Sequence, residues 1–143
     1  MKSVFLLILL ALCATLLPGC HRTPDEAQVR DAMASMAHAV EAGSAGDAST
    51  PLSDDFDGNA GELDRRALAN MIRLTTLHDE HIGVTMGPIA IERRGERIVA
   101  SFTVTLTRGG TLPDQLGVYR VESAWRKDGR RWLCYTASWK QSI

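Results

Sequence analysis

Hydrophobic and polar positions follow two different periods in the two halves of the chain beyond residue 23. Up to about His81, apolar residues recur every three or four positions, as on one face of an α-helix. From there to the end they alternate with polar residues, as on a half-buried strand. Because helices come first and strands follow, the pattern predicts an α+β domain with N-terminal helices packed on an antiparallel sheet.

The first helix is predicted from Asp25 to Glu41. Thr23 can cap it, Pro24 suits the first helical position, and Glu26 completes a capping box. A core-facing stripe follows at helical spacing: Val29, Met33, Met36, Ala37 and Val40. The small residues of 43–46 then end the helix.

The segment 47–57 is predicted as a short helix or turn that carries Leu52 and Phe56 inward. It contains three aspartates, Asp54, Asp55 and Asp57. An EF-hand loop that began at Asp54 would need Gly at its sixth position and Glu at its twelfth, but Arg65 occupies the twelfth. We therefore expect no calcium site here.

A second helix is predicted from about Glu62 to Asp79. Its broad inner face is expected to consist of Leu68, Met71, Ile72 and Thr75, with Ala67, Leu74 and His78 beside them.

The alternating half predicts four strands. Gly87-Pro88 indicates a bulge or an edge within the first, the second runs from Ile98 to Leu106, and 108–117 is expected to be a loop. The next strand leads from Tyr119 into the Asp128-Gly129 hairpin turn. In the closing strand, 132–140, one face is expected to carry Leu133, Tyr135, Ala137 and Trp139, and the other Trp132, Cys134, Thr136 and Ser138.

The first twenty residues have the composition of an export signal. Lys2 precedes an apolar run, Val4 to Leu17, that is too short for a comfortable membrane span and has the length of a secretory signal peptide. The run ends in Leu17-Pro18-Gly19-Cys20, which resembles the lipobox of bacterial lipoproteins. The resemblance implies cleavage before Cys20 and acylation of that residue. The alternative is an ordinary signal peptide in which Cys20 is incidental.

The lipobox also implies a domain organisation and a location. Residues 1–19 would be removed, 20–22 would form a short tether, and 23–143 would form one domain close to the membrane surface. Two or more acyl chains give stable attachment to a bilayer. His21, where an Asp would favour inner-membrane retention, favours the outer membrane, so we expect a lipid-anchored protein of the bacterial envelope that faces the periplasm.

Net charge and cysteine content limit the partners and the reactive groups expected of the mature chain. Its 15 basic and 17 acidic residues give a net charge of −2, which does not favour a nucleic acid partner. Cys134 is the one remaining cysteine, and its apolar neighbours predict a buried, inert thiol rather than a nucleophile. We expect no cofactor.

The order of elements resembles a known superfamily. The matching segments are the helix Asp25–Glu41, the stretch Leu52–Phe56, the helix with Arg65–Leu68, the strand Phe102–Thr105 and the closing Trp132–Thr136. Together they resemble the nuclear transport factor 2-like (SnoaL-like) proteins, whose α+β fold is cone-shaped. The resemblance implies a curved sheet around the long helix, with a cavity that some members use as an active site and others as a ligand or partner pocket.

Two clusters are candidates for function within such a cone. Tyr119, Trp125, Tyr135 and Trp139 could line a pocket for a small apolar ligand, or simply fill the core. His78-Asp79-Glu80-His81 could perform acid–base work or share a metal, although a polar helix end explains it equally and we predict no metal site. The basic clusters 93–94 and 127–131 fall at turns and are expected to be solvated, with binding to anionic lipid or lipopolysaccharide as the alternative.

These observations predict a small-molecule-binding or protein-interaction module. One alternative is an enzyme of isomerase or cyclase type that uses His78 or Asp79 with Tyr119 or Tyr135. Another is a structural component of the envelope that forms a homodimer through the sheet.

Overall fold

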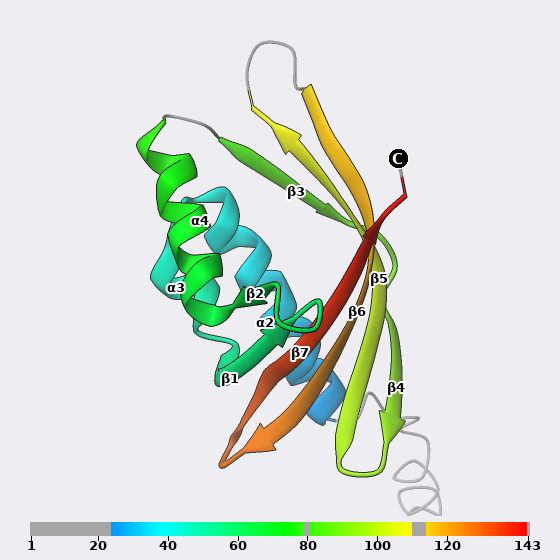
Figure 1. Ribbon diagram of the computed structural model, residues 1–143. Helices are drawn as coiled ribbons and strands as arrows, with labels where there is room; N and C mark the ends of the chain where they lie inside the picture. The colour runs from blue at the N-terminus through cyan, green and yellow to red at the C-terminus, as the bar shows by residue number, and fades with distance from the viewer. Residues whose placement is uncertain (1–23, 79–80, 110–113, 143) are drawn as a thin grey trace, which may run out of the picture.

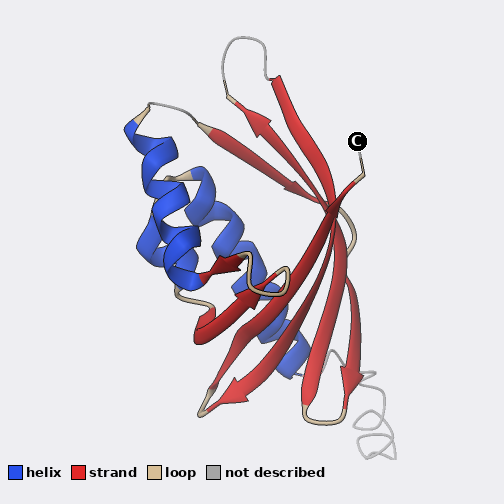
Figure 2. Cartoon of the chain, viewed as in Figure 1, coloured by secondary structure: helices blue, strands red, loops and turns tan. Residues whose placement is uncertain are grey.

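Helices cover one face of a curved sheet in the part of the chain that the computed structural model describes, residues 24–78, 81–109 and 114–142 (Figures 1 and 2). The helices are α2 (Pro24–Glu41), α3 (Ala45–Ser49) and α4 (Arg65–Leu77). The strands are β1 (Leu52–Gly58), β2 (Leu63–Asp64), β3 (Ile82–Met86), β4 (Ala90–Arg94), β5 (Arg97–Arg108), β6 (Asp114–Asp128) and β7 (Arg131–Gln141). The predicted α+β class with N-terminal helices is confirmed.

The sheet is mixed. Its strands lie in the order β2-β1-β7-β6-β5-β3, and β4 also pairs with β5. All pairs are antiparallel except β1 with β7, which is parallel. The predicted interruption at Gly87-Pro88 separates β3 from β4, and the amide of Gly87 donates to the carbonyl of Thr103 at 2.8 Å.

The segment 52–58 is a strand, so the predicted helix or turn is wrong beyond α3. Leu52 and Phe56 do point inward, at 3% and 6% exposure. Aspartate disfavours strands, but pairing with β7 overrides that local preference. The three aspartates have separate partners: Asp54 binds Arg65, Asp55 binds Arg126, and Asp57 accepts from the Gly61 amide.

Helix α4 begins later than predicted because Leu63 and Asp64 pair with β1. The Asp64 side chain then caps the helix by accepting from the Ala67 amide at 2.7 Å. The predicted inner face is correct for Ile72, but Met71 and Leu74 are 50% and 57% exposed. The reason is that α4 packs on α3, β1 and β2 rather than on the middle of the sheet.

Two features of the last strands also differ from the prediction. Strand β6 begins at Asp114, inside the predicted loop. In β7 a register shift places Ala124 opposite Thr136 and Trp125 opposite Cys134, so Tyr135 is an extra residue. A bulge exchanges the faces of the residues on either side of it, and therefore Trp132 and Cys134 face the same side as Ala137.

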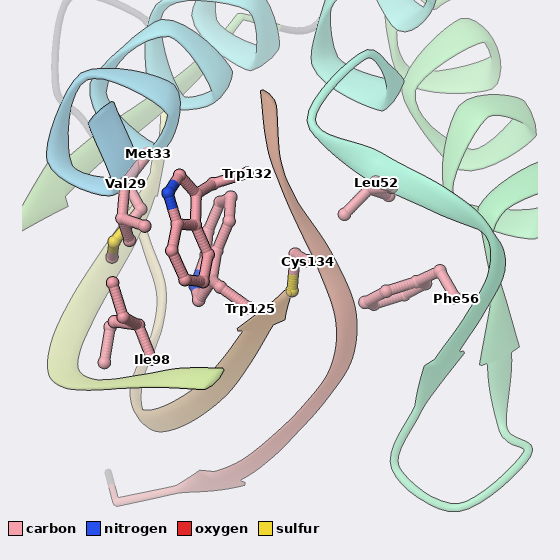
Figure 3. Packing of buried hydrophobic residues seen from close by; sticks show 9 residues of the cluster. Val29, Met33, Leu52, Phe56, Ile98, Trp125, Trp132 and Cys134 are labelled. Carbon is pink, nitrogen blue, oxygen red and sulfur yellow. The ribbon is translucent and has the colours of Figure 1, made fainter. Parts of the chain in front are cut away.

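The core lies between α2 and the lower half of the sheet. Figure 3 shows Val29 and Met33 of α2 beside the rings of Trp125 and Trp132, with Leu52 and Phe56 on the far side of Cys134. Trp125 is 2% exposed and Ile98 and Ala100 are fully buried. A smaller cluster joins the three helices through Ala39, Ala45, Ala48, Ala69 and Ile72.

Cys134 is expected to resist alkylation in the folded protein. It is 3% exposed, and burial raises the pKa of its thiol to about 12, so very little reactive thiolate forms near neutral pH. Mass spectrometry after iodoacetamide treatment should show modification in denaturant and almost none without it. Rapid modification of the folded chain would instead make Cys134 a reactive group.

Candidate functional site

The face of the sheet that forms the core continues beyond it as an apolar surface that is only half-buried. On β5, Phe102 and Val104 follow Ile98 and Ala100 at alternate positions. Their neighbours across the sheet are Val121 and Tyr119 of β6, and Val121 in turn lies opposite Trp139 of β7. We call Phe102, Val104, Tyr119, Val121 and Trp139 the inner-face patch; all five are partly exposed.

Two glycines make room for the aromatic rings of this patch. A Cβ on Gly58 of β1 would lie 2.6 Å from Cη2 of Trp139, so the indole packs directly over the backbone of β1. A Cβ on Gly117 would lie 2.9 Å from Cε2 of Tyr119. Both rings therefore pack closely against the backbone, which leaves no room for a side chain at either glycine.

A row of α4 side chains leads away from the core. Leu68 packs against the main core cluster, and Met71, Thr75 and His78 continue from it at helical spacing. Met71 is half exposed, and Leu74 and Leu77 are also exposed on the outer turns of α4. The helix therefore presents apolar side chains that its own neighbours do not cover.

The four aromatics predicted to share a pocket are divided among three environments. Tyr119 and Trp139 belong to the inner-face patch. Trp125 is buried in the core, where its Nε1 donates to Oγ of Ser123 at 3.0 Å. Tyr135, at the bulge, contacts the exposed Arg97 and Arg126 on the outer face of the sheet, because the bulge directs its ring away from the helices.

Of the titratable cluster 78–81, His78 is the C-cap of α4 and His81 immediately precedes β3. His78 is exposed, and its Nδ1 lies 2.7 Å from the carbonyl oxygen of Leu74 in its own helix. This is the arrangement of a histidine that satisfies a helix C-terminus. Asp79 and Glu80 lie outside the described residues. Among those described, no three His, Cys, Asp or Glu side chains come together as metal ligands.

Asp25 forms a charge network that the sequence did not reveal. Its carboxylate accepts from Nε1 of Trp132 at 3.0 Å, from Arg93 at 3.1 Å and from Lys127 at 3.2 Å. The guanidinium of Arg93 also lies 5.8 Å from the centre of the Trp132 ring. The hydrogen bond from Trp132 and the contacts with Arg93 and Lys127 lower the pKa of Asp25 to about 2. Sequence separations of 68 to 107 residues explain why no local signal exists.

A hollow of about 710 Å³ lies outside the cone, between α2, α3 and the β6–β7 turn. Its walls include Asp31 and His38 of α2, Asp47 of α3, and Arg130 and Arg131 of the turn. Of the predicted aromatics it contains none, although Trp132 contributes to its floor. Its open, mixed-charge lining differs from the apolar pocket that the sequence predicts.

Solved structures with the same arrangement are numerous. One is an NTF2-like protein with a cystatin-like fold from Novosphingobium aromaticivorans, with a TM-score of 0.72, 16% identity and 82% of each chain covered. Another is a candidate dehydratase of the NTF2-like family from Streptomyces avermitilis, with a TM-score of 0.68, 12% identity, and 83% of this chain and 97% of that chain covered. A third, Aln2 from a Streptomyces species, gives 0.71 at 10% identity over 80% of this chain and 88% of that chain.

The sequence itself gives no such match. No protein-family model matches it, and neither does any curated protein. At 10–16% identity the solved structures establish the fold alone, and that fold is the NTF2-like, cystatin-like α+β arrangement that the resemblance implied.

Proposed function

We propose that this chain, which has the NTF2-like fold, is a bacterial lipoprotein anchored through Cys20 and that its domain binds a small apolar ligand on the inner-face patch. The location that follows is the periplasmic side of the envelope, with the outer membrane favoured by His21. Protein interaction is the second role that such a domain can perform.

The observation that supports the binding proposal is the difference in side-chain burial along one face of the sheet. At the level of Trp125, every inward side chain on β5 is fully buried. Four and six residue pairs further along, at Phe102 and Val104, the inward side chains are still apolar but only partly buried. Apolar surface of this kind gains free energy when a ligand covers it, about 25 cal/mol for each Å² removed from water. The patch contains three aromatic rings, and one of them, Tyr119, supplies a hydroxyl for orienting a ligand.

Catalysis is less favoured by the same geometry. The enzyme alternative pairs His78 or Asp79 with Tyr119 or Tyr135. Tyr135 lies on the outer face, so it does not share a surface with the row that ends at His78, whereas Tyr119 lies on the inner face. His78 already engages its own helix through Nδ1.

An interaction through the outer face is a separate proposal with weaker support. Exposed positions there are polar: Thr103, Arg120, Glu122, Arg126 and Ser138. A homodimer through this face would be held by hydrogen bonds and ion pairs rather than by an apolar core. Native mass spectrometry of the unlipidated domain would detect dimers and a retained small molecule in one measurement.

Placing a charge on the inner-face patch is expected to weaken binding of a probe that has an apolar ring system. Val104→Glu should reduce the affinity for anilinonaphthalene sulfonate about tenfold or more, because the ligand would have to desolvate the carboxylate. Thr103→Glu, the adjacent exposed residue on the opposite face, is the matched control. Fluorescence titration of the folded variants makes the comparison. Equal probe binding by both variants would contradict the proposed site.

Removing the thiol of Cys20 is expected to detach the protein from membranes. The Cys20→Ser protein should take up no labelled fatty acid, and without residues 1–19 it should leave the membrane fraction, because the thiol that would accept the lipid is gone. Among the described residues no helix is long and apolar enough to span a bilayer. Metabolic labelling and membrane fractionation test this. Label and membrane association that persist in Cys20→Ser would show that the lipobox interpretation is wrong.

A further inference from the structure

The first turn of α2 and the tips of two hairpins lie together at one end of the domain, the lower end in Figure 1. Asp25 in that turn binds Arg93 next to the β4–β5 hairpin and Lys127 next to the β6–β7 hairpin. The other end contains the last turn of α4 and the Arg108 end of β5. These side-chain contacts place both hairpins beside the first turn of α2.

The lipobox places the anchor close to this end. Only residues 21–23 separate Cys20 from Pro24, the first residue of α2. An extended chain spans at most about 3.5 Å per residue, so the Cα atom of Cys20 lies within about 14 Å of that of Pro24. A lipid on Cys20 would therefore bring the two hairpins to the membrane surface and direct the last turn of α4 away from it.

The hairpins carry an excess of positive charge. Ranges 92–97 and 126–131 contain seven basic and three acidic residues, a net charge of +4, whereas the whole chain carries −1 and the rest of it therefore −5. Asp25 and Asp55 neutralise part of this charge. Arg130 and Arg131 at the β6–β7 tip are exposed. Arg94 at the other tip is 47% exposed and pairs with Glu92 at 2.9 Å, an acidic residue already included in the net charge above.

We propose that the two hairpin tips form a docking surface for anionic phospholipid headgroups. This inference rests on the proposed anchor at Cys20, because the anchor determines which end meets the bilayer. Guanidinium groups pair with phosphate through two parallel hydrogen bonds, and basic side chains are attracted to an anionic surface within about one Debye length, roughly 10 Å. Docking through the tips leaves the inner-face patch open to the periplasm.

The docking surface can be measured without the anchor. A chain that begins at residue 20 and carries Cys20→Ser retains every helix and strand that the structure describes. It should co-sediment with vesicles of equal parts phosphatidylglycerol and phosphatidylcholine, and not with phosphatidylcholine alone. Added salt should weaken the association, since exposed charges are screened.

Charge reversal at the two tips distinguishes binding through a local surface from binding that depends only on the net charge of the chain. Arg94→Glu with Arg130→Glu should lower partitioning onto the anionic vesicles about tenfold or more. Arg73→Glu with Arg120→Glu makes the same change in net charge at exposed positions of α4 and the outer sheet face, and should retain most of the binding. Circular dichroism melts confirm that each variant is folded.

Several outcomes would overturn the inference: equal loss in both double variants, no preference for anionic vesicles, or stronger binding to lipopolysaccharide than to phosphatidylglycerol. Fatty-acid labelling of the full chain tests the anchor independently. Absence of label on the full wild-type chain would defeat the proposed anchor, while the vesicle assay would still report whether the tips bind phospholipid.

Discussion

Trp125→Ala is expected to lower the free energy of unfolding by about 3–5 kcal/mol, the range for removing a buried aromatic side chain. The indole lies at the centre of the core, 2% exposed, beside Trp132 and among side chains of α2 and β5 (Figure 3). Its removal leaves a cavity and deprives the buried Ser123 hydroxyl of its donor. Because domains of this size are stable by only about 5–15 kcal/mol, the change removes a large share of the total stability. Urea denaturation followed by circular dichroism measures the change.

Trp139→Ala is the matched comparison, since it removes the same side chain from the same face of the sheet. Trp139 is only partly buried, so its loss should destabilise the domain less and should weaken binding of the apolar probe instead. Trp125→Phe keeps most of the volume and removes the hydrogen bond alone, which is worth about 1 kcal/mol. A Trp139→Ala defect as severe as that of Trp125→Ala would mean that the inner-face patch belongs to the core and serves no ligand.

Asp25→Ala is expected to destabilise the domain more than the loss of the exposed carboxylate of Asp55 does. It removes the acceptor of Trp132 Nε1 and leaves Arg93 and Lys127 side by side without a counter-charge. Asp25→Asn retains one acceptor for the indole and should therefore lie between the wild type and alanine. Asp55→Ala, whose ion pair with Arg126 is more exposed, is the control and should have a small effect. Thermal melts at neutral pH rank the variants.

The same carboxylate should make stability depend on pH in the acid range. The pKa of Asp25 is about 2 in the folded chain against an ordinary value of 3.8, so the folded state binds the proton less readily than the unfolded state. The stabilisation is therefore complete above pH 3.8 and is lost as the pH falls through 2. Denaturation midpoints across this range should fall less steeply for Asp25→Ala than for the wild type. Parallel curves would show that the network does not contribute to stability.

Local sequence patterns were sufficient to predict the elements that depend on neighbouring residues in the chain. Pro24 and Glu26 predict the start of α2, and Asp128-Gly129 predicts the β6–β7 turn. The alternation of apolar and polar residues predicts the core strand β5. The order of these elements is sufficient to indicate the fold, because helices followed by an antiparallel meander have few ways to bury their apolar faces. Placing Cys134 in the core needed only the apolar character of its neighbours.

Tertiary structure decided what depends on partners distant in the chain. Leu52 to Gly58 became a strand because β7 offers a parallel edge, although three aspartates argue locally against it. One bulge at Tyr135 separated that residue from Trp139, since side chains alternate with a period of two and an extra residue reverses their faces. The Asp25 network and the common end of the two hairpins arise from contacts across 68 or more residues. The periodicity of apolar residues indicates which side chains are buried. Which neighbours bury them is decided by contacts between segments that meet only in the folded chain.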